Sequence, residues 1–333
     1  MKYLIIGGSG FIGQHFMKKL NEEDIIYNLD INDGVNNTKF TEFNILYDNF
    51  DDIKLNKNEQ ITLIHLAAVH FDFQKKYFET NVSGTKNILG FIEKNPNIKK
   101  YVFFSSVATY GDSTNGKDEN SLQKPNNDYG KSKLEAEIEI LKWKTNQKNK
   151  TQVIIVRPAV VFGEYNFGNV FNLIQQIRSG LFAIIGKGLN IKSIAYAGNL
   201  VDSVMFCLEK IKDDIFIYNY SDYPQKNIFE QSKVISEIVL KKSKLIKIPL
   251  SVTKLITIPV DFLEKVFNRD LKINSMRVKK FTVSTFFNSK KIRDRGFIQN
   301  ITVEEAFSKT NEWIVSVNVK KLRSKWLRRA AKL

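Results

Sequence analysis

The stretch KYLIIGGSGFIG, residues 2–13, joins an apolar run to a glycine-rich turn. The run Tyr3–Ile6 is short and apolar, as buried strands are. Gly7, Gly10 and Gly13 then permit a tight turn, a close backbone approach to pyrophosphate, and close packing of a helix on a strand. The N-terminus of the following helix would present free N–H groups to a phosphate. This stretch therefore predicts the first strand, loop and helix of a dinucleotide-binding fold.

Apolar runs and helical stretches alternate along the first half of the chain. Such alternation predicts an α/β fold, a Rossmann-type doubly wound parallel sheet with a smaller C-terminal substrate lobe. We expect a NAD-binding domain at residues 1–160, with later segments returning to it, a mainly substrate-binding lobe at 161–315, and a basic amphipathic tail at 316–333. Strands are expected at 3–6, 25–29, 62–66, 100–105 and 152–156, and helices at 10–20, 77–93 and 129–143.

Three polar residues downstream of the glycine turn suggest alcohol-to-ketone chemistry. Tyr129 and Lys133 are four residues apart, about one helical turn, so their side chains share a face. A lysine cation beside a tyrosine favours the phenolate and lowers its pKa, which gives a general base near neutral pH. Ser106 closes a strand-like run and could hold a substrate oxygen beside the tyrosine. A chance YxxxK pair on a solvated helix is the alternative.

Asp30, at the end of the second expected strand, indicates which nucleotide binds. Its carboxylate can accept hydrogen bonds from the adenosine ribose hydroxyls and would repel a 2′-phosphate, so NAD is favoured over NADP. Asn44 and Ile45 are candidates to flank the adenine, with an ordinary loop as the alternative. Asn81 could support the active-site backbone or a water, with an ordinary polar helix residue as the alternative, and we count it with the cofactor-binding residues. The expected cofactor-binding residues are Gly7, Gly10, Phe11, Ile12, Gly13, Asp30, Asn44, Ile45, Leu66, Ala67, Ala68, Asn81, Tyr129 and Lys133.

The formal net charge of +16 leaves several classes of partner open. Seven basic residues and no acidic one lie in residues 319–333. One helical stripe there would suit an anionic membrane surface, with a solvated basic end as the alternative; it consists of Val319, Leu322, Trp326, Ala330 and Leu333. The apolar stretch 248–267 is a second membrane candidate, with a helix packed in the substrate lobe as its alternative. We expect no nucleic-acid partner and no metal site, because no motif for either accompanies the charge.

Cysteine content and hydropathy suggest where the protein works. Cys207 is the single cysteine, so an internal disulfide is excluded, which suits a reducing cytoplasm. No run of about 18 apolar residues predicts a spanning helix. The expected location is therefore the cytoplasm, peripherally on the inner face of the cytoplasmic membrane. A homodimer is left open.

Together these residues resemble the extended short-chain dehydrogenase/reductase family, and within it the NAD-dependent epimerases and dehydratases. The resemblance covers nearly the whole chain and includes GGSGFIG, HLAA at 65–68, YGKSK at 129–133 and the turn Arg157-Pro158. It implies NAD as the cofactor and Ser106, Tyr129 and Lys133 as the catalytic residues.

A narrower similarity links the later segments to bacterial 4-epimerases of undecaprenyl-diphosphate-linked N-acetylglucosamine. The segments are RPAVVFGE at 157–164, GNVFNL at 168–173, GKGLNIKSIAY at 186–196 and RVKKF at 277–281. The similarity implies a C4 epimerisation that yields lipid-linked N-acetylgalactosamine for a surface polysaccharide such as O-antigen or capsule. Ser106, Asn169 and Arg277 are the expected substrate contacts, although Arg277 could equally face solvent in its basic run.

Three rival functions remain at this stage. A soluble UDP-N-acetylglucosamine or UDP-glucose 4-epimerase would use the same site, but Val160 stands where soluble UDP-galactose 4-epimerases carry an asparagine. A 4,6-dehydratase would need an acid beside the serine, where this chain has Val107. A non-enzymatic NAD-binding scaffold could dispense with Tyr129 and Lys133, and this chain has both.

Overall fold

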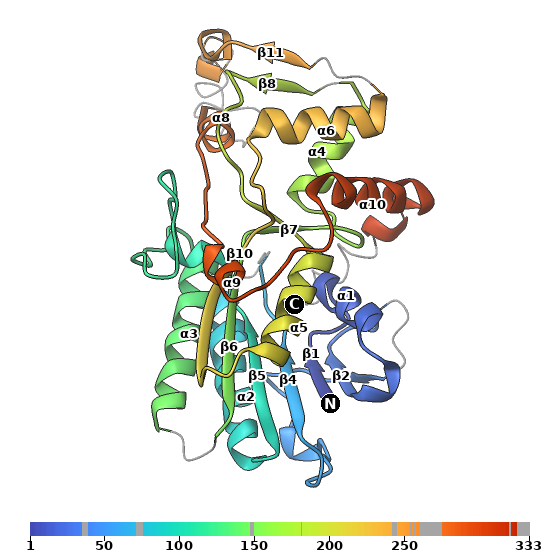
Figure 1. Ribbon diagram of the computed structural model, residues 1–333, viewed down its shortest axis with the longest axis vertical. Helices are drawn as coiled ribbons and strands as arrows, with labels where there is room; N and C mark the ends of the chain where they lie inside the picture. The colour runs from blue at the N-terminus through green and yellow to red at the C-terminus, as the bar shows by residue number, and fades with distance from the viewer. Residues whose placement is uncertain are drawn as a thin grey trace.

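The glycine-rich turn follows one strand of a seven-stranded parallel sheet in the computed structural model of the chain (Figure 1). The structure describes residues 1–34, 39–70, 76–146, 150–180, 182–241, 245–253, 255, 257–259, 275–319 and 321–324. The strand order is β10-β6-β5-β4-β1-β2-β3, and every neighbouring pair is parallel. The strands are β1 Lys2–Ile6, β2 Ile25–Asp30, β3 Phe40–Glu42, β4 Ile61–His65, β5 Ile98–Phe104, β6 Gln152–Pro158 and β10 Ile215–Tyr220.

Helices cover both faces of this sheet, which is why its strands are apolar on both sides. In β1, Tyr3 and Ile5 point into the core under α1 and α5, whereas Leu4 and Ile6 point into the core under α2 and α3. This alternation follows from the two-residue period of a strand. The helices and helical turns of this layer are α1 Phe11–Lys19, η1 Glu22–Asp24, η2 Phe50–Asp52, η3 Glu79–Ser83, α2 Gly84–Lys94, η4 Val107–Tyr110, α3 Asp128–Asn146, α5 Ala197–Lys210 and α9 Lys290–Asp294.

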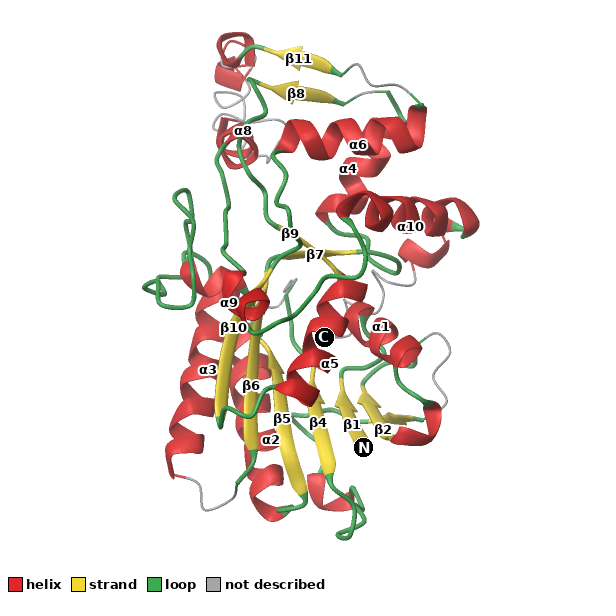
Figure 2. Cartoon of the chain, in the orientation of Figure 1, coloured by secondary structure: helices red, strands yellow, loops and turns green. Residues whose placement is uncertain are grey.

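A smaller lobe sits beyond the carboxyl edge of the sheet (Figure 2). Its core is built from aromatic and branched side chains of α4, α6 and α10, including Phe171, Ile235 and Phe307. Helices α6 and α10 both begin at capping boxes, which satisfy backbone N–H groups at their N-termini. The lobe contains β7 Val160–Phe162, α4 Asn169–Arg178, β8 Ala183–Ile185, β9 Ile194–Tyr196, α6 Ile228–Leu240, β11 Ile246–Ile248, α8 Ser275–Thr282 and α10 Val303–Ser316.

The prediction of a Rossmann-type parallel sheet with a smaller lobe is confirmed by this architecture. The chain crosses between the two parts repeatedly. Helix α5 packs on α1 against the sheet, and β10 pairs with β6 at the sheet edge. Residues 161–315 are therefore shared between the lobe and the NAD-binding domain.

Where the structure describes the tail, it differs from the prediction of a membrane-facing helix. Val319 and Leu322, which we expected on a membrane-facing stripe, instead pack against the core of the smaller lobe. They do so because the turn after α10 directs the chain back across that core, and the amide of Leu322 donates to the carbonyl of Asn318. Residues 325–333, including Trp326, lie outside the described residues. Within the described part of the chain, no helix has the length and apolar character needed to cross a bilayer.

Candidate active site

Glycine residues leave the backbone of the turn between β1 and α1 without side chains. Gly7 has φ +85°, in the left-handed region that favours glycine, and a Cβ there would lie 2.4 Å from the Ala67 amide nitrogen. A Cβ at Gly13 would lie 2.1 Å from the Gly8 carbonyl oxygen. Both contacts are impossible for a larger residue, so the loop can close against α1 and β4 only as glycine. The result is a cradle of backbone at the N-terminus of α1, suited to phosphate.

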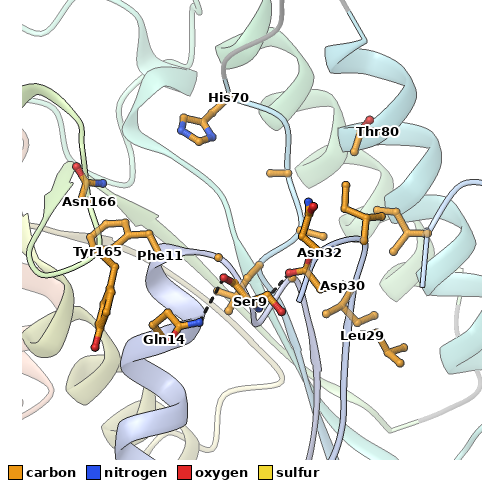
Figure 3. A pocket seen from close by; sticks show the side chains of 18 of the residues that line it. Ser9, Phe11, Gln14, Leu29, Asp30, Asn32, His70, Thr80, Tyr165 and Asn166 are labelled. Atoms are coloured by element: carbon orange, nitrogen blue, oxygen red, sulfur yellow. Dashed lines mark hydrogen bonds between the residues drawn. The ribbon is translucent and has the colours of Figure 1, made fainter. Parts of the chain in front are cut away.

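A cavity of about 510 Å³ opens over this cradle (Figure 3). It runs along the carboxyl ends of β1, β2 and β4, where open α/β sheets bind their ligands. The smaller lobe closes one side through residues 165–169 and Trp313. The predicted residues that line it are Gly7, Gly10, Phe11, Asp30, Asn44, Ile45, Leu66, Ala67, Ala68 and Asn169.

Asp30 is held in a fixed orientation at the end of β2. One carboxylate oxygen accepts from the amide of Ser9 at 3.0 Å and the other from the amide of Asn32 at 3.0 Å. Figure 3 shows Asp30 beside Ser9 on the wall of the cavity. A carboxylate oriented in this way can accept further hydrogen bonds from ribose hydroxyls, since each oxygen has two lone pairs.

Ser106 and Tyr129 meet where β5 ends and α3 begins. The Ser106 hydroxyl caps the turn η4 by accepting from the amide of Ala108 at 3.1 Å. Burial raises the pKa of Tyr129 to about 12, a hydrogen bond with Ser106 acts to lower it, and nearby Tyr77 raises it. The Tyr77 and Tyr129 rings lie 6.3 Å apart. Tyr77 was not predicted as a site residue, because nothing in its local sequence marks it.

Lys133 is buried one turn further along α3. Its ammonium lies 4.4 Å from the centre of the Phe103 ring on β5. Burial lowers the pKa of Lys133 to about 7, and the Glu137 carboxylate acts to raise it. The structure thus differs from the expectation that Lys133 lowers the pKa of Tyr129. Burial disfavours the charged form of both groups, so it moves their pKa values apart.

Two histidines face Lys133 from β4 and the loop after it. Burial, with Lys133 nearby, lowers the pKa of His65 to about 3 and that of His70 to about 4. The Nδ1 atom of His65 lies 2.9 Å from the Tyr101 hydroxyl, as expected for a hydrogen-bonded core histidine. Both rings are therefore neutral near pH 7.

Asn81 holds the backbone of the site together. Its side-chain oxygen accepts from the amide of Val69 at 2.8 Å. Its amide nitrogen donates to the Val69 carbonyl at 3.0 Å and to the Ser132 hydroxyl at 2.9 Å. Asn81 sits in the π-helical turn η3, a feature frequent at functional sites. Of the roles expected for Asn81, these bonds describe support of the backbone.

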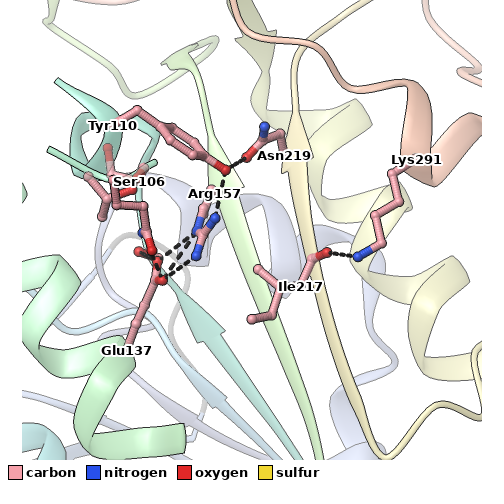
Figure 4. Close-up of polar contacts among 10 residues, drawn as sticks. Ser106, Tyr110, Glu137, Arg157, Ile217, Asn219 and Lys291 are labelled. Carbon is pink, nitrogen blue, oxygen red and sulfur yellow. Dashed lines mark hydrogen bonds and ion pairs between the residues drawn. The ribbon is translucent and has the colours of Figure 1, made fainter. Parts of the chain in front are cut away.

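Behind Ser106, a buried network joins α3 to β6 (Figure 4). Arg157 pairs with Glu137 through Nη2 at 2.6 Å and donates to the Tyr110 hydroxyl through Nη1 at 2.6 Å. Tyr110 in turn donates to the side-chain oxygen of Asn219 at 2.8 Å. Ser105, the neighbour of Ser106, donates its hydroxyl to Glu137. The network fixes the strand end that presents Ser106.

Another connection to the smaller lobe was not predicted. His15 on α1 is buried, and its Nε2 atom lies 3.2 Å from the carbonyl oxygen of Glu164. Tyr165 follows with φ +71°, an uncommon conformation for a residue other than glycine, and it lines the cavity. Only the folded chain brings α1 and this loop together, so no local pattern could have shown the contact.

The structure describes the expected substrate contacts Asn169 and Arg277 to different extents. Asn169 is the first residue of α4 and lines the cavity. Arg277 lies in α8, but its side chain is outside the described part of the structure. Among the described residues, no cluster of three or more histidine, cysteine or acidic side chains could hold a metal ion.

Comparison with known proteins agrees with this geometry. Residues 3–219 match the NAD dependent epimerase/dehydratase family. The N-acetyl-alpha-D-glucosaminyl-diphospho-ditrans,octacis-undecaprenol 4-epimerase of Escherichia coli O157:H7 is 33% identical over 315 residues, covering 93% of this chain and 94% of that protein. The UDP-glucose 4-epimerase of Vibrio cholerae is 26% identical over 266 residues, covering 76% of this chain and 80% of that protein.

The fold has close structural counterparts. The UDP-N-acetylglucosamine 4-epimerase of Methanobrevibacter ruminantium M1 superposes with a TM-score of 0.73 at 17% identity, covering 95% of this chain and 98% of that one. The predictions of the family, of the fold and of an enzyme that depends on NAD are confirmed. The chain belongs to the NAD dependent epimerase/dehydratase family.

Proposed function

We propose that this protein is a 4-epimerase that converts N-acetylglucosamine to N-acetylgalactosamine on undecaprenyl diphosphate. The observation that supports the proposal is the hydrogen bond between Ser106 and Tyr129, with Lys133 buried one helical turn further on, in a chain 33% identical to the Escherichia coli undecaprenol-linked epimerase. The product would enter synthesis of a surface polysaccharide such as O-antigen or capsule.

The residues of the cavity fit NAD. Without side chains at Gly7 and Gly10, the pyrophosphate could approach the N-terminus of α1, where the first backbone N–H groups have no partner within the helix. Asp30 would accept hydrogen bonds from the adenosine ribose hydroxyls of NAD and would repel a 2′-phosphate. Asn44 and Ile45 line the end of the cavity near Asp30, where the adenine would lie. NAD, when bound, supplies a hydride acceptor and donor at the sugar carbon.

The catalytic residues manage the proton and the oxygen at C4. Tyr129 accepts the proton of the 4-hydroxyl and later returns it, acting as general base and then as general acid. Ser106 donates a hydrogen bond to the same oxygen, which holds C4 in one position. Lys133, buried one helical turn further along α3, would hold the nicotinamide ribose of bound NAD. The sugar turns over within the site after hydrogen leaves C4 and before hydrogen returns, so both faces of C4 are presented in turn.

Two substrates distinguish this proposal from its soluble rival. The protein is incubated with polyprenyl-diphosphate-N-acetylglucosamine and, separately, with UDP-N-acetylglucosamine, and the C4 epimer is measured in each. We expect turnover of the lipid-linked sugar to exceed that of the nucleotide-linked sugar. Preferential turnover of the UDP sugar would instead assign a nucleotide-sugar 4-epimerase. A product that has lost water would assign a dehydratase.

A further inference from the structure

The end of the smaller lobe farthest from the parallel sheet carries an unusual surface (Figure 1). We call it the lobe tip and define it as β8 with its following turn, β11, and the helical residues 250–253, 255 and 257–259. Strands β8 and β11 form a small parallel sheet, with Ile246 opposite Ala183 and Ile248 opposite Ile185. The helical residues continue directly from β11.

The helix at the lobe tip is amphipathic, but polar residues are on its buried side and apolar residues are exposed to water. Among its described residues, the buried ones are Thr253 and Thr257, four positions apart on one face. On its outward side, the side chains of Leu255 and Ile258 are 71% and 64% exposed. Surface helices normally place apolar residues inward and polar residues outward. The opposite arrangement marks an interaction surface.

The apolar character extends onto the neighbouring elements. Ile246 on β11 is 66% exposed, and Leu250 and Val252 are also exposed. Leu250 lies over the turn after β8, since a Cβ on Gly186 would be 3.3 Å from its Cγ. The exposed residues thus belong to adjoining parts of one tip.

The charge of the lobe tip has a single sign. No acidic residue occurs in residues 182–192 or 245–259, whereas Lys187 and Lys247 are present and exposed. Apolar side chains bordered by lysines suit the boundary between acyl chains and anionic headgroups. A two-fold contact between copies would bring the same lysines together without an acidic partner, so a second copy is the less favourable occupant.

We propose that the lobe tip docks the protein on an anionic lipid bilayer. Leu255, Ile258 and Ile246 would enter the headgroup boundary, and Lys187 would meet lipid phosphates. This inference rests on the proposed function for its purpose, since a polyprenyl-linked sugar is available only at a membrane surface. It names the face of the molecule that meets that surface.

The test measures sedimentation of the full-length protein with vesicles of phosphatidylglycerol and phosphatidylcholine. In the variant Leu255→Ser/Ile258→Ser we expect at least about tenfold weaker binding, because two apolar side chains no longer leave water. The matched control is Leu122→Ser/Ile298→Ser, which removes two exposed apolar residues away from the lobe tip. The control should bind like the unchanged protein. Equal binding by the tip and control variants would overturn the proposal.

A charge-reversed variant and an assembly measurement complete the test. Lys187→Glu should weaken binding to vesicles with phosphatidylglycerol and change little on phosphatidylcholine alone. Sedimentation velocity without lipid detects the other occupant: a dimer that the tip variant converts to monomer, with vesicle binding unchanged, would make this face a contact between copies.

The vesicles carry no sugar, so this test is independent of catalysis. Turnover of a short-chain lipid-linked analogue in solution is measured in parallel. Turnover without vesicle binding would overturn the docking surface and leave the proposed function in place. Vesicle binding lost with the tip variant, in a protein that turns over neither substrate, would support the docking surface and contradict the proposed function.

Discussion

At the scale of single residues, the site is defined by burial as much as by residue type. Tyr129 and Lys133 both lie where their neutral forms are favoured, with pKa values of about 12 and about 7. Two neighbours oppose these shifts. The hydrogen bond with Ser106 acts to lower the pKa of Tyr129, and the charge of Glu137 acts to raise the pKa of Lys133. The spacing of Tyr129 and Lys133 could be predicted from the sequence, but the direction of their pKa shifts could not, because desolvation depends on the whole surrounding fold.

Replacing the tyrosine tests its assigned role. Tyr129→Phe keeps the ring and removes the group that exchanges a proton with the substrate. We expect turnover to fall by roughly 10²–10⁴-fold, the usual contribution of positioned acid–base catalysis. Binding of NAD, followed by protein fluorescence, should remain. Near-normal epimerisation by this variant would show that another group moves the proton.

The Glu137 carboxylate should set the pH at which Lys133 loses its charge. His65 and His70 are neutral near pH 7, so the described charge that supports the Lys133 cation is that of Glu137. Removing this charge should lower the pKa of Lys133 by about 1 pH unit, so the cation is lost at lower pH. The alkaline limb of the activity profile should move in the same direction.

This pH shift can be measured without substrate, from the lysine ¹³Cε NMR titration assigned with Lys133→Arg. Glu137→Gln alone leaves Arg157 buried without its partner, so the double variant Glu137→Gln/Arg157→Gln is measured as well. Glu139→Gln is the matched control, because Glu139 lies on the same helix and pairs with Lys86 at the surface. An unchanged titration of Lys133 in both Glu137 variants would refute this account.

Asp30 should determine the preference for NAD. Its carboxylate is fixed by the amides of Ser9 and Asn32 and lines the cavity. Asp30→Ala removes both the acceptor for the ribose hydroxyls and the repulsion of a 2′-phosphate. We expect weaker binding of NAD and a narrower difference between NAD and NADP by calorimetry. Equal affinity for the two cofactors in the unchanged protein would contradict this role.

At the scale of elements, local sequence patterns predicted strands and helices correctly, whereas the packing between distant segments could not be predicted. The strand, turn and helix at residues 2–19 could be predicted because the glycine spacing fixes them within a few residues. The strand β10 could not, since it follows the start of the smaller lobe and pairs with β6 only in the folded chain. The stripe on Val319 and Leu322 was identified correctly as apolar, but its partner is the core of the smaller lobe.

Two truncations test the packing of Val319 and Leu322 against the smaller lobe. Deleting residues 319–333 removes Val319 and Leu322 from the core, which should lower the melting temperature by several degrees. Deleting only residues 325–333 retains Val319 and Leu322, so the melting temperature should fall less than in the longer deletion, as measured by circular dichroism. The shorter deletion also removes four basic residues, and weaker binding to anionic vesicles would support a membrane role for the tail. Identical melting temperatures for the two truncations would contradict the packing of Val319 and Leu322.

At the scale of the whole molecule, the chain passes between its two parts several times and gathers the site between them. Residues 165–169 and Trp313 of the smaller lobe wall the cavity that begins at the glycine turn. The lobe tip at the far end presents apolar residues outward, a feature that the sequence of residues 248–267 left undecided. Exposure is a property of the fold, so only the structure could separate a packed helix from an outward-facing one.

The most direct test of the central claim follows the hydrogen at C4 of the sugar. Polyprenyl-diphosphate-N-acetylglucosamine carrying deuterium at C4 is converted in ordinary water, and the product is analysed by mass spectrometry. The account predicts N-acetylgalactosamine that retains the deuterium at C4, because the same hydrogen leaves and returns without exchange with water. Product with hydrogen at C4 would contradict it, since that outcome requires a proton from solvent at the carbon.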